Sequence, residues 1–144
     1  MLEKLMATAV LPASDLARAK QWWHDVLGRD PVYSDPEGEA EFYDVGGTAV
    51  MVYRTDFAGT AKNTTLNLIT DNLDRDMTHL RTHGVMFHDY DMPNLKTVDG
   101  VAELGEERAA WFSDSEGNII SIGQVSPTMM EMAAKMRGTA AGMG

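Results

Sequence analysis

Two stretches of the chain place apolar residues at helical spacing. The first follows Ser14-Asp15, either of which can cap a helix by accepting a hydrogen bond from a free N–H, and it stops at Gly28. The second follows Asp71-Asn72 and stops at Gly84. The apolar positions are Leu16, Ala19, Trp23, Val26 and Leu27 in the first stretch, and Leu73, Met77 and Leu80 in the second. Because such a stripe buries one side of a helix, the pattern predicts two amphipathic helices.

Short runs rich in β-branched, aromatic and aliphatic residues surround these helices and predict strands. They cover residues 5–11, 39–45, 48–54, 64–70, 86–90, 108–113 and 118–124, with a short extended piece near 32–34. Gly46-Gly47 separates two of the runs and favours a two-residue hairpin, because type I′ turns need φ > 0 at both positions. This register places Phe42 opposite Met51.

The two halves of the chain repeat the same order of parts. Leu16, Arg18 and Trp23 recur as Leu73, Arg75 and Leu80, while Phe42, Val50 and Val52 recur as Trp111, Ile120 and Ile122. Each half therefore predicts a strand, a helix and three strands. We expect an α+β fold of two βαβββ modules that form a cupped mixed sheet with the helices on its outer face. The modules would cover about residues 1–58 and 62–126 of a single domain, 1–126.

Alternation along the strands assigns side chains to the two faces of the sheet. Val50, Val52, Ile120 and Ile122 should face the helices. The opposite face then combines aromatic rings with hydroxyls and an amide, a mixture that suits an organic ligand. The predicted ligand-binding residues are Thr8, Phe42, Met51, Tyr53, Thr65, Asn67, Trp111 and Ser121. The alternative is that this face closes a dry core or a dimer interface.

Three segments carry a family resemblance. They read LPASDLARA at 11–19, WWHDVLG at 22–28 and DSEGNII at 114–120. These segments resemble the vicinal-oxygen-chelate superfamily, which includes glyoxalase I, extradiol dioxygenases and bleomycin-resistance proteins. The resemblance covers about residues 5–124 and implies the two-module fold. Because this fold hosts isomerases, lyases, dioxygenases and non-catalytic drug binders, it leaves the function open.

Metal-dependent members of this superfamily hold their metal on the first and last strands of each half. The matching positions here are Thr8, Met51, Thr65 and Ser121. Zn, Ni, Fe and Mn sites favour imidazole or carboxylate donors, so these four side chains form no suitable ligand set. We therefore predict no metal and no cofactor, which argues against glyoxalase I and extradiol dioxygenase activity.

A few titratable side chains are candidates for acid or base chemistry. His88 precedes the long loop 91–106, which could cover the cavity, and its ordinary pKa near neutrality would suit a general base. Glu103 is a candidate acid or base beside it, although Glu106 and Glu107 make an exposed acidic run the simpler interpretation. His88 as an exposed loop histidine is the corresponding alternative.

Other polar motifs favour structural roles. His79 and His83 have a spacing that can hold zinc, but Leu80 stands where the zinc-protease motif has Glu, so an exposed helix face is expected. Gly46-Gly47 and the turn 114–118 do not lead into a helix N-terminus, so we interpret both as turns rather than as phosphate sites.

The overall charge excludes some partners. The 144 residues carry 22 acidic and 12 basic side chains, a formal net charge of −10, and no cysteine. This charge opposes nucleic-acid phosphates and anionic membrane surfaces, and disulfides are excluded. No run approaches the ~20 apolar residues of a spanning helix, and no signal peptide is recognisable, so we expect a cytoplasmic protein.

The C-terminal segment predicts a short helix over 127–137, followed by a disordered tail over 138–144. Met129, Met132 and Met136 form one apolar side of this helix, which would pack on the sheet or on a second copy in a homodimer.

The leading hypothesis is metal-independent binding of a small, partly aromatic organic molecule. The alternatives are an enzyme that uses His88 or Glu103, and an interaction module whose open face is covered by a partner chain.

Overall fold

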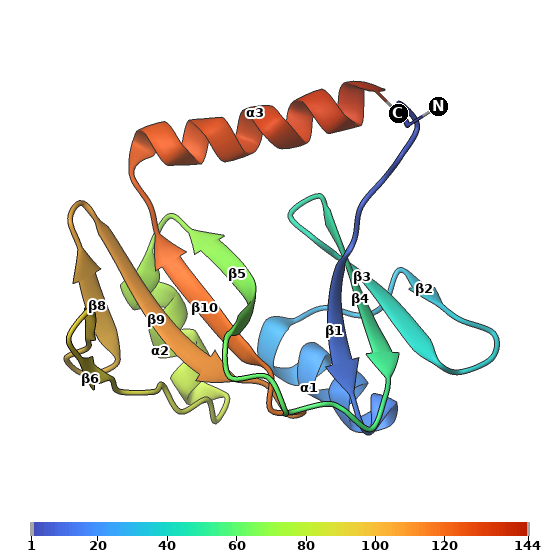
Figure 1. The fold of residues 1–144 in the computed structure, drawn as a ribbon, viewed down its shortest axis with the longest axis horizontal. Coiled ribbons are helices and arrows are strands. Elements are labelled where there is room, and N and C mark those ends of the chain that lie inside the picture. The colour runs from blue at the N-terminus through green and yellow to red at the C-terminus, as the bar shows by residue number, and fades with distance from the viewer. Residues whose placement is uncertain (1, 144) are drawn as a thin grey trace.

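The chain folds as two successive modules followed by a helix (Figure 1). The computed structural model describes the backbone of residues 2–143 and the side chains of residues 2–137. The first module contains β1 (Ala9–Ala13), α1 (Leu16–Leu27), β2 (Tyr33–Ser34), β3 (Ala40–Val45) and β4 (Thr48–Arg54). The second contains β5 (Thr64–Thr70), α2 (Leu73–Thr82), β6 (Asp91–Met92), β7 (Leu95–Lys96), β8 (Val101–Leu104), β9 (Glu107–Ser113) and β10 (Ile119–Gln124). The last helix is α3 (Pro127–Met143).

Each module builds its own four-stranded mixed sheet. The strand orders are β1-β4-β3-β2 and β5-β10-β9-β8, with β6 and β7 forming a separate hairpin. In both sheets the first strand pairs in parallel with the last strand of the module, and the other pairs are antiparallel. The predicted α+β fold of two βαβββ modules is confirmed. It consists of two sheets instead of one continuous cupped sheet.

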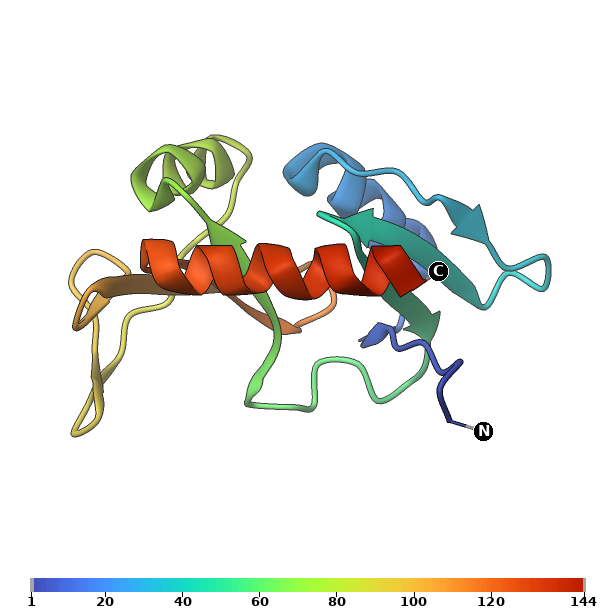
Figure 2. The ribbon, with the colours of Figure 1, turned by 90° about the horizontal axis from the view of Figure 1, so that it is seen from above.

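The two helices of the modules cover the same side of the sheets, as Figure 2 shows. We call the opposite side of both sheets the open face. Helix α3 lies across one end of the two sheets in both views (Figures 1 and 2). No helix within residues 2–143 is both long and apolar enough to cross a membrane.

The internal repeat extends to the helix caps. The side chains of Asp15 and Asn72 accept hydrogen bonds from the backbone N–H of Arg18 and Arg75, each at 3.0 Å. Both caps satisfy an N–H that lacks a partner inside its helix. The cap residues expected from the sequence are therefore the ones that start α1 and α2.

The core lies between the helices and the sheets. Val50, Val52, Ile120 and Ile122 are buried there, as alternation predicted. Trp23 stacks on Tyr43 with ring centroids 4.3 Å apart in the first module. Trp22 packs against the cores of both modules, and its ring lies 6.4 Å from that of Phe112. The aromatic pair Trp22-Trp23 thus fills one module and connects it to the other.

Two strand predictions are wrong in their position. The run 86–90 is not a strand and makes only an isolated bridge between Phe87 and Phe112. In the sheet, the first of the three strands after α2 is instead β8, which lies inside the predicted loop 91–106 and pairs with β9. The predicted run 5–11 becomes β1 at Ala9–Ala13, so Thr8 precedes the strand.

The hairpin register was predicted correctly. Gly46 and Gly47 have φ angles of 59° and 90°, the left-handed conformation that a type I′ turn requires. Phe42 consequently lies opposite Met51.

Helix α3 continues to Met143, beyond the expected end at residue 137. Gly144 lies outside the described residues, so the predicted disorder of the tail remains a prediction there.

Candidate functional site

The open face of the second module carries a row of uncharged polar groups beside an aromatic ring. Trp111 of β9 lies opposite Ser121 of β10, which in turn pairs with Asn67 of β5. The Ser121 hydroxyl donates to Asn67 Oδ1 at 2.8 Å. Ser121 is only 7% exposed, while Asn67 is exposed, so the amide is the group that a ligand can reach.

A hydrogen-bonded histidine extends this row. The His88 backbone N–H donates to the Trp111 carbonyl at 2.8 Å, which holds segment 86–90 along the edge of β9. His88 Nε2 lies 3.0 Å from the Ser113 hydroxyl, and its Nδ1 lies 3.0 Å from the Tyr90 hydroxyl. Tyr90 also meets the Trp111 ring edge to face at 5.7 Å. The second module therefore presents two rings and a half-buried imidazole on its open face.

The first module presents mainly apolar and aromatic groups. Phe42 lies between Tyr33 of β2 and Met51 of β4, and its ring is 5.6 Å from that of Tyr33. Val10 of β1 completes the row as the parallel partner of Met51. The exposed fractions of Tyr33 and Val10 are 56% and 46%, so this row is open to an incoming molecule.

The residues predicted to bind a ligand fall into one group on each sheet. Phe42, Met51 and Tyr53 lie on the first sheet, and Thr65, Asn67, Trp111 and Ser121 lie on the second. Thr8 is exposed and precedes β1. Thr65 donates its hydroxyl to the Ile119 carbonyl at 3.0 Å. Sequence reasoning missed Tyr33 as part of the site. Tyr33 lies on a strand of only two residues, which is too short for an alternation of apolar and polar residues to be recognised in the sequence.

The side chains at the superfamily's metal positions do not fit a divalent ion. Thr8, Met51, Thr65 and Ser121 offer three neutral hydroxyls and a thioether, and the hydroxyls of Thr65 and Ser121 donate to protein oxygens. Hard and borderline divalent ions prefer carboxylate or imidazole ligands. Within the described part of the chain, no three His, Cys, Asp or Glu side chains come together in a way that could hold a metal.

Glu103 lies on the other side of the sheet from the open face. It is exposed on β8, pairs with Arg108 at 3.3 Å, and borders a groove of about 550 Å³ beside α2. Arg108 also pairs with Asp74 of α2 at 3.0 Å. Alternation along β8 and β9 explains this placement, since Arg108 is the cross-strand partner of Glu103. Glu103 is thus not positioned to act on a molecule at the open face.

His79 of α2 and His83, which caps the C-terminus of this helix, both contact backbone groups. His79 Nε2 lies 3.3 Å from the Val26 carbonyl at the end of α1, and His83 Nδ1 lies 2.8 Å from the His79 carbonyl. His79 therefore connects the helices of the two modules, which fits a structural role better than a metal site.

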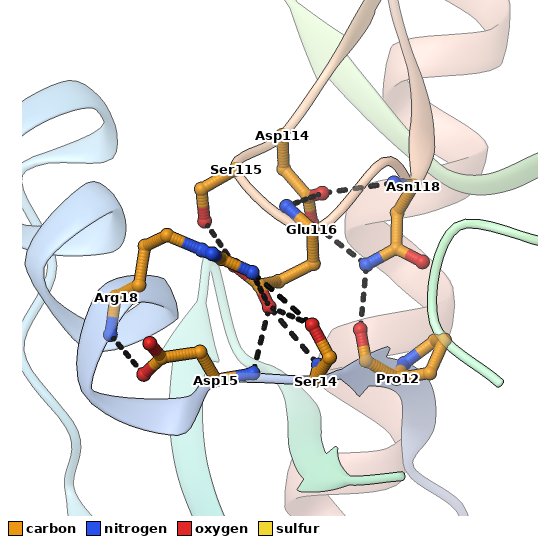
Figure 3. A network of polar contacts seen from close by, with 8 residues as sticks. All are labelled: Pro12, Ser14, Asp15, Arg18, Asp114, Ser115, Glu116 and Asn118. Atoms are coloured by element: carbon orange, nitrogen blue, oxygen red, sulfur yellow. Dashed lines mark hydrogen bonds and ion pairs between the residues drawn. The ribbon is translucent and has the colours of Figure 1, made fainter. Parts of the chain in front are cut away.

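The segment 114–118 is a turn, as expected from the sequence, and its side chains also contact the N-terminus of α1 (Figure 3). The Glu116 carboxylate accepts from the backbone N–H groups of Ser14 and Asp15, both at 3.0 Å, and from Arg18 Nε at 2.7 Å. Burial raises the pKa of Glu116, but hydrogen bonds from Arg18, Asp15 and Ser115 outweigh it and hold the pKa at about 2. A side chain of the second module therefore caps the first helix of the first module.

Two neighbouring residues complete this connection. The Asn118 amide donates to the Pro12 carbonyl at 2.9 Å and to Asp114 Oδ2 at 2.8 Å (Figure 3). Asp114 Oδ1 accepts from the backbone N–H of Glu116 and of Asn118. Burial raises the pKa of Asp114 despite these hydrogen bonds. The motif DSEGN thus joins the modules and does not face the candidate site.

Comparisons with known proteins agree with this architecture. No family model and no curated protein sequence matches the chain. Among solved structures, the antibiotic-binding protein TnmS3 from Streptomyces sp. CB03234 is 25% identical, covering 85% of this chain and 98% of its own, with a TM-score of 0.59. UcmS2 is 17% identical, covering 84% of this chain and 99% of its own, with a TM-score of 0.63.

A structure that contains a metal ion has a comparable TM-score. A variant of the fosfomycin resistance protein FosX from Listeria monocytogenes, solved with Mn(II) and 1S,2S-dihydroxypropylphosphonic acid, has a TM-score of 0.62. It is 14% identical and covers 86% of this chain and 92% of its own, so the likeness concerns the fold. These proteins share the two-module βαβββ architecture described above. The chain therefore has the two-module fold of the vicinal-oxygen-chelate superfamily, to which these proteins belong, as its sequence motifs predicted.

Proposed function

We propose that this protein binds a small, partly aromatic organic molecule on the open face, without a metal ion, and holds it without turnover. The observation that carries the proposal is the pair of matched rows, Tyr33–Phe42–Met51 on one sheet and Trp111–Ser121–Asn67 on the other. At two of the positions where metal-dependent members carry ligands, these rows hold Met51 and Ser121, and the rings of Phe42 and Trp111 lie directly opposite them.

The composition of the rows supports an aromatic ligand. Trp111 and Phe42 offer ring faces or edges to a flat molecule, and the exposed amide of Asn67 can orient a polar substituent. The likeness to TnmS3, an antibiotic-binding protein, points in the same direction. Burial of one ring against the ligand would contribute about 2 kcal/mol, which corresponds to roughly 30-fold in affinity.

A second copy of the chain would complete the site. The open face carries Val10, Tyr33, Tyr53 and Ile69, whose exposed fractions range from 36% to 56%. Exposed apolar groups gathered on one face are typical of a binding surface. We propose that two copies pair over these faces and enclose the ligand between them. Sedimentation velocity tests this part, because a monomer at tens of micromolar protein would contradict it.

The ligand proposal is tested by titrating a panel of aromatic metabolites and antibiotics against tryptophan fluorescence. For each compound that binds, isothermal calorimetry compares wild type with Trp111→Ala and Trp111→Phe. We expect Trp111→Ala to lose roughly 30-fold in affinity and Trp111→Phe to retain most of it, because phenylalanine keeps a ring. Phe57→Ala, in the loop between β4 and β5, serves as the control. Equal affinity of wild type and Trp111→Ala for every compound would show that the open face is not the site.

The environment of His88 favours a second candidate function. Its ring lies between the hydroxyls of Ser113 and Tyr90 at 3.0 Å on both sides, so one ring nitrogen can accept a proton while the other is held. A general base in this position would make the protein an enzyme acting on the bound compound. Mass analysis after incubation separates the two functions, since a binding protein returns the compound unchanged. Loss of turnover in His88→Ala with retained binding would support the enzyme.

A further inference from the structure

A cleft of about 400 Å³ runs between the two modules and meets the open face at Asn67 and Ile69. Its floor is apolar and comes from both modules: Leu27, Val45, Val50, Leu66, Leu68 and Ile122. Of the ligand-binding residues predicted from the sequence, only Asn67 borders it. The volume lies in the range of sites for small organic molecules.

Two arginines border this cleft from different elements. Arg29 follows α1, and Arg137 belongs to α3, which lies across the ends of both sheets (Figures 1 and 2). Arg137 extends beside the β3–β4 turn, where its Cδ is 3.5 Å from the position that a Cβ on Gly47 would occupy. The Arg137 side chain thus lies beside this turn, at the rim of the cleft.

Neither arginine forms the ion pair with a carboxylate that most arginines of this acidic chain form. Ion pairs of 2.7–3.0 Å to a carboxylate are made by Arg18, Arg54, Arg75 and Arg108. Arg29 donates only to the Leu27 carbonyl, at 3.2 Å. Among the described side chains, no carboxylate lies within ion-pair distance of Arg29 or Arg137. Two of the unpaired guanidinium groups of a chain with a net charge of −10 thus border one apolar cleft.

Asp76, the acidic side chain that borders the cleft, does not neutralise the two arginines. Asp76 is engaged by Arg75 at 3.0 Å and by the Thr70 hydroxyl. The larger groove beside α2 differs in this respect, because it balances three basic with three acidic side chains: Arg81, Lys96, Arg108, Asp74, Asp99 and Glu103. The inter-module cleft therefore combines an apolar floor with an excess of positive charge.

We propose that the inter-module cleft binds a small amphipathic anion. Its apolar body would lie on the floor, and its carboxylate or phosphate would accept hydrogen bonds from Arg29 and Arg137. Guanidinium groups match both anions geometrically and form charge-assisted hydrogen bonds to them. The cleft lies within one chain, and its arginines and most of its floor lie outside the rows proposed to bind the aromatic ligand, with which it shares only Asn67.

Three probes with the same chain length test the proposal: decanoate, decyl phosphate and decanol, each titrated by isothermal calorimetry into the full-length protein below its aggregation limit. We expect the anions to bind at least tenfold more tightly than decanol, because only they can use the guanidinium groups. The double variant Arg29→Gln/Arg137→Gln should lose at least tenfold in affinity for the anions and nothing for decanol. The tighter of the two anions identifies the head group.

Three further variants test whether the anions bind in the inter-module cleft itself. Thr48→Trp places a large ring at the exposed rim and should block all three probes, whereas Arg54→Gln removes an arginine outside the cleft and should change nothing. Trp111→Ala should leave decanoate binding unchanged, which separates this site from the open face. The proposal is overturned if decanol binds as tightly as the anions, if the double variant binds decanoate like wild type, or if wild type binds no anion at millimolar concentration.

Discussion

Replacing Glu116 by glutamine tests the contact that joins the two modules. The Glu116 side chain is 1% exposed, and its pKa is about 2 compared with the ordinary 4.5. A tenfold change in proton affinity is worth about 1.4 kcal/mol, so the ionised carboxylate contributes about 3 kcal/mol to the free energy of unfolding at pH 7. Glutamine keeps the shape and one acceptor oxygen but removes the charge that Arg18 and the α1 N-terminus stabilise.

The contribution has a defined pH dependence. Because the folded-state pKa is lower than the unfolded one, the stabilisation is fully present above pH 4.5 and is lost as the pH falls towards 2. About half of it should remain near pH 3. The free-energy difference between wild type and Glu116→Gln should therefore shrink in acid.

Urea unfolding followed by tryptophan fluorescence at pH 7, 5, 4 and 3 measures this difference. Glu106→Gln is the matched control, since Glu106 is exposed, and it should change the free energy of unfolding by less than about 0.5 kcal/mol. A Glu116→Gln variant as stable as the control at pH 7, or a difference that stays constant from pH 7 to pH 3, would refute the reasoning.

Two other substitutions test the packing by the same unfolding measurement. Tyr43→Phe should leave the free energy of unfolding unchanged or raise it by up to about 1 kcal/mol, because the buried Tyr43 hydroxyl has no hydrogen-bond partner among the described residues; a loss above about 1 kcal/mol would contradict this. Gly117→Ala should destabilise more than Gly38→Ala by at least about 1 kcal/mol. Both glycines have positive φ, but a Cβ on Gly117 would lie 2.9 Å from the Gly59 Cα, whereas Gly38 faces open space. Equal losses would show that this close approach costs nothing.

Local patterns predicted most of the fold. The caps at Asp15 and Asn72, the turn at Gly46-Gly47 and the buried alternate positions depend on neighbours within a few residues, so they could be inferred from the sequence. The position of β8 could not. Segment 86–90 and β8 share the outer edge of β9, and which of them forms a strand depends on tertiary packing.

The candidate site was predictable to the extent that it follows strand alternation. The register placed Phe42 opposite Met51, as the structure has them. The contact of Glu116 with Ser14 joins positions far apart in the chain, and no local pattern indicated it. The same holds for the approach of Arg137 to the inter-module cleft, because it depends on where α3 lies across the sheets.

Native mass spectrometry of the purified protein, before and after treatment with EDTA, tests most directly whether the open face recognises an organic molecule without a metal ion. The sample should carry either a compound retained from expression or one selected by the fluorescence titration. We expect an organic adduct whose mass and occupancy do not change with EDTA. A transition metal bound at one ion per subunit, with the organic adduct lost when EDTA removes that ion, would contradict the account.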